Sequence, residues 1–225
     1  MTELSPRVAA FLEFATTNTY SPDEERVALA TSRELADNGV ASVASIAARA
    51  ERTVDGVEGI LANWQAVFRA DNGDVVGFLG LTAAEMPNRI RFGAAERSAW
   101  CAWDTLFLPG VVGQPAHVRS TDPVTGATIE LDVALDGTPS NLSHPDLVLS
   151  FREPPPEGLT DEVQKAFCHF VHFFESERSA ASWVAEHPGT FVMSLQEGAE
   201  LARRTNAMRY PTTLGAVDPL GPPRD

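Results

Sequence analysis

The spacing of apolar residues changes near residue 66, and this change predicts a chain that is helical first and built from paired strands afterwards. Residues 5–17 place apolar side chains at the helical interval. Later segments alternate between apolar and polar side chains on either side of Asp71-Asn72-Gly73 and of residues 122–126, which are hairpin signals. The sequence therefore predicts an α+β fold.

The helical region contains a pattern that resembles a helix-turn-helix. Ser21 and Pro22 supply the N-cap and the first helical residue of a helix that should run to about Asp37. Two shorter helices should follow, over residues 43–50 and 53–64. Together with the first hairpin, they predict a helical, winged-helix-like N-terminal domain over residues 1–80.

The rest of the chain predicts a mixed core of antiparallel strands flanked by helices over residues 81–209. We expect a strand over 89–93 and a helix over 94–107. Aromatic and β-branched residues within 165–176 favour another strand, although the length of the segment also allows a helix. The proline- and glycine-containing residues 210–225 predict a disordered tail.

Charge and composition narrow the classes of function. The formal net charge is -14, which disfavours binding to nucleic acid and to anionic membrane surfaces. The first residues do not resemble a signal peptide, and no apolar run is long enough for a membrane helix. Two cysteines are too few for a disulfide framework, so we expect a cytoplasmic protein with reduced thiols.

One of these cysteines, Cys101, precedes Asp104 by three residues in an apolar run. If residues 94–107 are helical, both side chains lie on one face, with Trp100 and Trp103 beside them. Burial there would raise the pKa of both groups, and a protonated aspartate could deliver a proton where water cannot. A deprotonated cysteine is a ligand for soft metals, whereas a lone buried cysteine is commonly inert core.

The second cysteine, Cys168, lies in the segment FCHFVHFF. As a strand, this segment would place Cys168, Phe170 and His172 on one face and His169 on the other. Four interpretations stay open. The two cysteines could bind zinc together with His169 and His172, form a redox disulfide with each other, hold a thiophilic ion beside a carboxylate, or be inert core residues.

Four segments occur in an order that resembles the organomercurial (alkylmercury) lyases. They are WCAWDTLFLPGVVG, STDPVTG, FCHFVHFF and SAASWVAEHPG. The resemblance covers about residues 85–200. It implies that Cys101, Asp104 and Cys168 are catalytic, with the two thiolates binding mercury and the aspartate transferring the proton. The implied reaction is protonolysis of a carbon–mercury bond to a hydrocarbon and Hg²⁺.

The resemblance also implies a substrate pocket and a set of partners. We expect the pocket for the alkyl or aryl group to be lined by Trp100, Trp103, Phe167 and Phe170. No organic cofactor is implied; mercury enters as substrate and leaves as product. An external thiol is the implied co-reactant, with cellular thiols and a mercuric reductase as partners for the product, and a homodimer as one expected assembly.

Some members carry further cysteines where this chain has Thr121 or Asp122, and His169. This difference bears on product handling rather than on the core reaction. The alternative function is a non-catalytic binding protein for Hg²⁺ or Cu⁺, since two thiols would serve it equally well. Asp104 favours the enzyme, because a carrier needs no proton donor. A transcription regulator that uses the helix-turn-helix pattern is disfavoured by the negative charge.

Overall fold

The computed structural model describes residues 3–16, 19–153 and 163–215. The helices are α1 (Pro6–Ala15), α2 (Pro22–Asn38), α3 (Val43–Ala50), α4 (Val54–Ala62), α5 (Asp104–Val112), α6 (Val163–Ala166), the 3₁₀ turn η1 (Cys168–Phe170), α7 (Glu177–Glu186) and α8 (Leu195–Arg209). The strands are β1 (Val67–Arg69), β2 (Val75–Phe78), β3 (Leu81–Thr82), β4 (Asn88–Phe92), β5 (Ala95–Ala99), β6 (Ala116–Thr121), β7 (Thr128–Val133), β8 (Pro139–Ser140), β9 (Val148–Arg152), β10 (Phe173–Phe174) and β11 (Thr190–Ser194).

The strands form two sheets in which neighbouring strands are antiparallel. The larger sheet has the order β1-β2-β3-β5-β4-β6-β7-β8, and the smaller has the order β10-β9-β11. The larger sheet is continuous across residues 80 and 81, the boundary between the two predicted domains, because β2 and β3 pair with each other on either side of it. This mixture of helices and antiparallel sheets confirms the predicted α+β fold.

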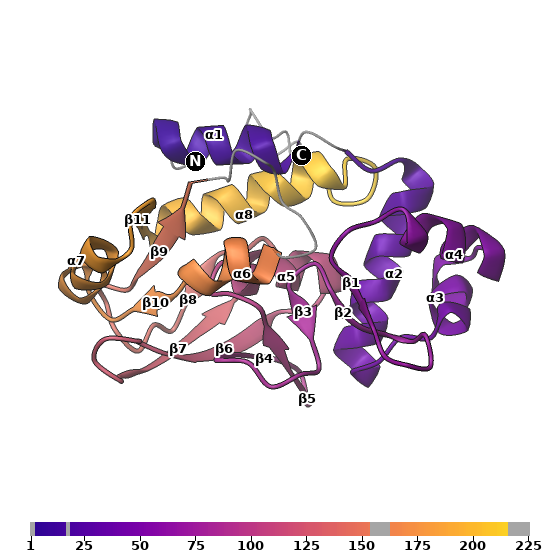
Figure 1. The fold of residues 1–225 in the computed structure, drawn as a ribbon, viewed down its shortest axis with the longest axis horizontal. Coiled ribbons are helices and arrows are strands. Elements are labelled where there is room, and N and C mark those ends of the chain that lie inside the picture. The colour runs from indigo at the N-terminus through magenta and orange to yellow at the C-terminus, as the bar shows by residue number, and fades with distance from the viewer. Residues whose placement is uncertain (1–2, 17–18, 154–162, 216–225) are drawn as a thin grey trace.

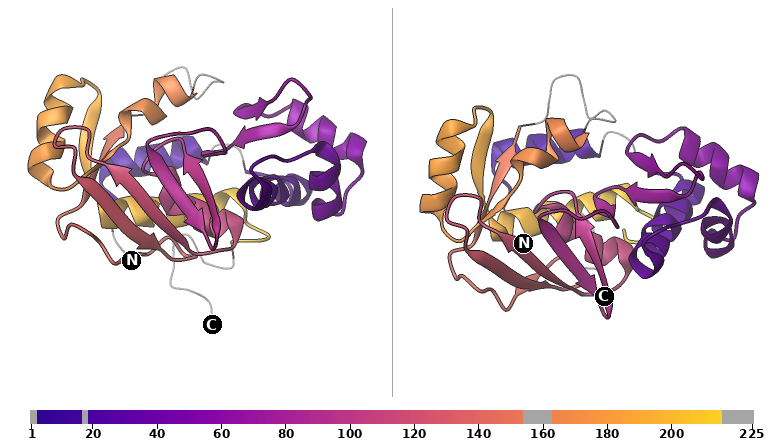
Figure 2. Two further views of the ribbon diagram at one scale, coloured as in Figure 1. Left: turned by 90° about the horizontal axis from the view of Figure 1, so that it is seen from below. Right: turned by 60° about the horizontal axis from the view of Figure 1, so that its bottom comes forward.

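The helices are distributed around the two sheets (Figure 1). Helices α2, α3 and α4 gather at one end of the molecule and α7 lies at the other, while α8 runs between them. Figure 2 shows the same separation from two further directions. Helix α8 packs on α5 and α1, and α2 also packs on α5, so α5 lies at the centre of the helix contacts. Within the described ranges, no helix is long and apolar enough to cross a bilayer.

The predicted caps and turns of the N-terminal half are confirmed. Ser21 and Glu24 form a capping box, with Pro22 at the start of α2. The helix ends at Asn38, and Gly39 follows it with a φ of 75°, the left-handed C-cap conformation that glycine favours. Helix α3 has the predicted bounds, and the hairpins β1–β2 and β6–β7 form as the alternating patterns predict.

The predicted helix over residues 94–107 is wrong over residues 94–103 and is confirmed only from Asp104 onward. Residues 95–99 form β5, a strand that pairs with β3 on one side and β4 on the other. Gly93, with a φ of 55°, provides the turn between β4 and β5. Two neighbouring strands satisfy the backbone of β5, and this pairing outweighs the helical propensity of its alanine, glutamate and arginine residues. The helix begins only at Asp104 and continues through Pro109.

The predicted strand within residues 165–176 is also wrong over most of its length. The chain there ends the short helix α6, makes the turn η1 and becomes a strand only at Phe173 and Phe174. Cys168 and His172 therefore do not share a strand face. Phe167, one of the aromatic residues that suggested a strand, is buried by tertiary packing outside any strand, and this packing overrides its β-propensity.

The tail is ordered further than the sequence predicts. Tyr210 is 1% exposed, and both Thr212 and Thr213 donate hydroxyl hydrogen bonds to Glu25, at 2.8 and 2.7 Å. Because Glu25 is itself fully buried, these bonds satisfy a carboxylate inside the protein. The remainder of the predicted disordered tail, residues 216–225, lies outside the described residues.

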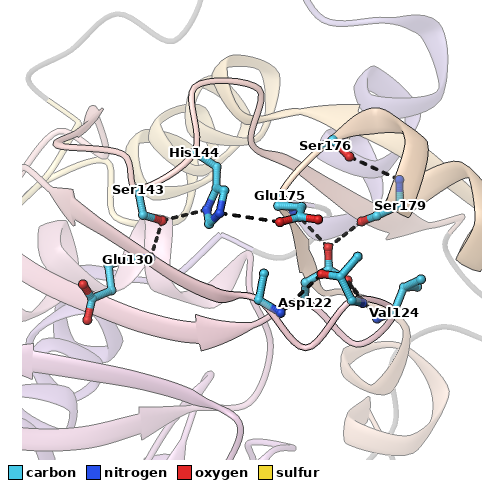
Figure 3. Close-up of polar contacts among 10 residues, drawn as sticks. Asp122, Val124, Glu130, Ser143, His144, Glu175, Ser176 and Ser179 are labelled. Atoms are coloured by element: carbon cyan, nitrogen blue, oxygen red, sulfur yellow. Dashed lines mark hydrogen bonds and ion pairs between the residues drawn. The ribbon is translucent and has the colours of Figure 1, made fainter.

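A buried aspartate joins the β6–β7 turn to the segment that precedes α7 (Figure 3). One oxygen of Asp122 accepts the backbone N–H groups of Val124 and Thr125, at 2.8 and 3.1 Å. Its other oxygen accepts the N–H of Glu175 at 3.0 Å and the hydroxyl of Ser179. These four bonds hold the pKa of Asp122 below its usual value despite the opposing effect of burial. Asp122 thus has the turn-forming role that its position before a hairpin turn predicts.

Candidate active site

Cys101 and Asp104 lie at the junction between β5 and α5. Cys101 is in the loop that links the two elements, and Asp104 is the first residue of the helix. The carboxylate of Asp104 turns back along the chain, and its Oδ2 accepts the backbone N–H of Cys101 at 2.8 Å. The predicted closeness of these residues is therefore confirmed, but it comes from a helix start rather than from one helix face.

Cys168 reaches this junction from the turn η1. The turn is closed by hydrogen bonds from Phe170 N–H to Phe167 O, at 2.9 Å, and from Val171 N–H to Cys168 O, at 3.1 Å. The N–H of Ala102, directly after Cys101, donates to Val171 O at 3.1 Å. This last bond joins two segments far apart in sequence and brings the two cysteines together.

The thiols of Cys101 and Cys168 and the carboxylate of Asp104 form a compact buried cluster. Their ligand atoms all lie within 4.8 Å of one another. The three residues are 0%, 5% and 5% exposed respectively. In the parts of the chain that the structure describes, this is the one group of three or more cysteine, histidine, aspartate or glutamate side chains arranged to hold a metal ion.

The alternatives left open by the sequence can be compared with this geometry. Neither His169 nor His172 belongs to the cluster. The Nε2 atom of His172 instead lies 2.8 Å from the carbonyl oxygen of His169. A zinc site made of two cysteines and these histidines is therefore absent from the described residues. Cys101 and Cys168 are both free thiols. The arrangement is that of two thiols beside one carboxylate.

Burial dominates the electrostatics of the cluster. It raises the pKa of the Asp104 carboxyl to about 6, although hydrogen bonds with the Cys101 thiol and N–H and the charge of Arg209 oppose the shift. Burial also raises the pKa of Cys101 well above its usual value, helped by the hydrogen bond with Cys168 and the charge of Asp104. For Cys168, the hydrogen bond with Cys101 opposes the shift, but burial and Asp104 leave the pKa raised. The resting site therefore holds two protonated thiols and a carboxyl whose pKa is about 6.

Three of the four aromatic residues predicted to line a pocket are buried, namely Trp100, Trp103 and Phe167. The fourth, Phe170, is half-buried and lies beneath the guanidinium of Arg152, at 4.0 Å. These positions are compatible with an apolar wall around the cluster, and a pocket role for the four residues stays a prediction.

Two further aromatic residues, Phe11 and Phe151, pack against the predicted pocket residues Trp103 and Phe167, and sequence reasoning did not predict these contacts. Phe11 of α1 stacks on Phe167 at 5.1 Å between ring centroids and contacts Trp103 edge to face at 5.5 Å. Phe151 of β9 contacts Phe11, Trp103 and Phe167 in the same way, at 4.9, 5.8 and 5.2 Å. The apolar spacing of residues 5–17 predicts that Phe11 is buried, but no local signal shows against what.

Comparison with known proteins shows to which protein family the chain belongs. Residues 81–206 match the family model described as alkylmercury lyase. An alkylmercury lyase of Staphylococcus epidermidis is 34% identical over 176 residues, which is 78% of this chain and 79% of that protein. The chain belongs to the alkylmercury lyase family. A second alkylmercury lyase, from Bacillus cereus, is 32% identical over 75% of each chain.

The fold agrees with this assignment to the alkylmercury lyases. A solved structure described as the mercury-bound form of MerB2 matches with a TM-score of 0.66 and 23% sequence identity, over 89% of this chain and 99% of that one. The buried cluster lies within residues 81–206, the part of the chain that the family model covers.

Proposed function

We propose that the protein cleaves the carbon–mercury bond of alkyl- and arylmercury compounds by protonolysis, with Cys101, Asp104 and Cys168 as the catalytic residues. The observation that carries the proposal is the cluster itself, in which two thiols and a carboxyl with a pKa of about 6 meet in a buried site. Family membership supports the same reaction.

The first step is exchange of the organomercurial onto the enzyme. A substrate R–Hg–SR′ gives its mercury to one protein thiol, and the proton of that thiol leaves with the released R′SH. The second protein thiol then binds the same mercury and gives its proton to the Asp104 carboxylate. With a pKa of about 6, Asp104 is mostly ionised at neutral pH and can accept this proton.

The second step breaks the carbon–mercury bond. The two thiolates of Cys101 and Cys168 donate electron density to mercury, and the bonding electron pair moves to carbon. Carbon takes the proton held by Asp104 and leaves as the hydrocarbon RH, while Hg²⁺ stays bound to the two thiolates. The apolar surroundings keep competing water away from the proton.

The third step returns the enzyme to its starting state. Two external thiol molecules exchange onto the mercury, each giving its proton to a protein thiolate, and the product leaves as a dithiolate complex. The proposed co-reactant is thus a cellular thiol, with a mercuric reductase as the acceptor of the product, and no organic cofactor takes part.

The test is release of benzene from phenylmercuric acetate by the reduced protein in excess thiol, followed by gas chromatography. Cys101→Ala, Cys168→Ala and Asp104→Ala should each abolish turnover, while Asp71→Ala, a change at an exposed turn residue, should not. Full turnover by Asp104→Ala would exclude the proposed proton transfer. Tight mercury binding by the unchanged protein without benzene release would identify a soft-metal binding protein instead.

A further inference from the structure

The two-residue turn between β2 and β3 lies directly against the Asp104 side chain. Phe78 pairs with Leu81, so Leu79 and Gly80 form the turn. Both have positive φ values, 40° and 93°. Such hairpin turns favour glycine, and Gly80 supplies it at the second position.

Gly80 also has a contact that the turn alone does not require. A Cβ atom on Gly80 would lie 2.7 Å from Cγ, 2.8 Å from Oδ1 and 2.9 Å from Cβ of Asp104. Real Cβ atoms essentially never approach other heavy atoms so closely. The space for the carboxyl of Asp104 therefore exists because residue 80 has no side chain.

Hydrogen bonds fix the same contact from both sides. The carbonyl oxygen of Gly80 accepts the N–H of Trp100 at 2.8 Å, which ties the turn to the residue before Cys101. The N–H of Cys101 in turn holds Oδ2 of Asp104 at 2.8 Å. The carboxyl is thus held between the Cys101 backbone and the Gly80 backbone, and neither the turn nor the loop can shift freely to admit a methyl group.

We propose that Gly80 is a positioning residue for Asp104, keeping the carboxyl where it takes up the thiol proton and delivers it to the leaving carbon. This proposal rests on the proposed function and adds to it a residue that touches neither mercury nor the reacting carbon. A change at Gly80 should therefore affect the two steps differently. Mercury capture needs only the thiols, whereas cleavage of the carbon–mercury bond needs a correctly placed proton.

The chain offers a matched control for Gly80→Ala. Gly73 lies in the turn of the β1–β2 hairpin with a φ of 88°, and a Cβ there would meet nothing within 4 Å. Gly73→Ala therefore introduces the same left-handed backbone strain without touching Asp104. The difference between the two variants isolates the contact with the carboxyl.

The first measurement compares mercury uptake with single-turnover benzene release. Gly80→Ala should still bind one phenylmercury per protein, by ultraviolet absorbance of the mercury–thiolate, but release benzene about 10- to 100-fold more slowly. Gly73→Ala should cleave at the rate of the unchanged protein. Equal cleavage rates for the two variants would overturn the proposal.

A second measurement needs no activity and applies even if Gly80→Ala folds poorly. The loss of thermal stability caused by Gly80→Ala should be smaller in an Asp104→Ala background, where Cγ and Oδ1 are gone, than in the unchanged protein. The loss caused by Gly73→Ala should be the same in both backgrounds. An equal loss for Gly80→Ala in both backgrounds would refute the contact. If the unchanged protein releases no benzene, the proposed function fails while this stability cycle still reports on the contact.

Discussion

Replacing Asp104 with asparagine should stabilise the folded protein at neutral pH and less so in acid. Burial raises the pKa of this carboxyl from 3.8 to about 6, so the folded state binds the proton more tightly than the unfolded state. The stability linked to that proton is full below pH 3.8 and is lost as the pH rises through about 6. The difference between the two pKa values corresponds to about 3 kcal/mol.

Asparagine has nearly the same shape as aspartate but carries no charge. The substitution therefore removes the loss of folding stability that ionisation of Asp104 causes as the pH rises. Its amide oxygen can accept the N–H of Cys101 in place of Oδ2. The stability gained by Asp104→Asn should rise by about 2 kcal/mol between about pH 4.5 and pH 7, because the linkage relation places most of the change there. The two thiols do not titrate in this range, since their pKa values are raised.

The assay is urea unfolding of both proteins in reducing buffer across this pH range, followed by tryptophan fluorescence. Trp100 and Trp103 are both buried near the cluster, so their emission should report on unfolding. A difference in free energy of unfolding that stays constant from acid to neutral pH would refute the reasoning. It would mean that solvent or a cation compensates the buried carboxylate.

Two other substitutions test buried contacts that the structure shows elsewhere in the fold. Asp122→Asn should lower the free energy of unfolding by about 2 kcal/mol at pH 7 in urea titrations, because it weakens the charge-assisted bonds to Glu175 and Ser179. Since the pKa of Asp122 is lowered, the difference in stability from the unchanged protein should shrink as the pH falls through that pKa. A difference independent of pH would contradict this expectation. Phe11→Ala should lower the free energy of unfolding by about 3–5 kcal/mol in the same titration, because Phe11 is 1% exposed and contacts Phe167. A loss below about 1 kcal/mol would show that α1 does not pack on Trp103, Phe151 and Phe167.

Local signals in the sequence were sufficient for the elements that local chemistry determines. The capping box of Ser21 and Glu24 determines the start of α2, and the left-handed Gly39 determines its end. Each of these signals lies within a few residues of the helix end that it determines. Turn residues similarly determine the β6–β7 hairpin, where Asp122 accepts the N–H groups that follow it. Such contacts can be predicted from sequence because both partners are neighbours in the chain.

The candidate site was predicted in composition but not in geometry. Cys101 and Asp104 lie close together under either local structure, because a spacing of three residues allows contact both along a helix and across a helix start. The strand β5 could not be predicted locally, since its residues pair with β3 and β4 rather than with each other. The meeting of Cys101 with Cys168 depends on a bond between Ala102 and Val171, which no short sequence window contains.

Cys101 and Cys168 lie far apart in the sequence, and this distance along the chain determines how bound mercury would affect the protein. An ion held by both Cys101 and Cys168 cross-links the β5–α5 junction to the turn η1, much as a disulfide would, and closes a long loop of chain. Folding favours this chelate, because in the unfolded chain the two thiols can bind one ion together only at the entropic cost of closing the loop. Under the proposed function, the product is therefore a reversible cross-link within its own enzyme, and each turnover would end with thiol exchange removing a cross-link that the reaction has just formed.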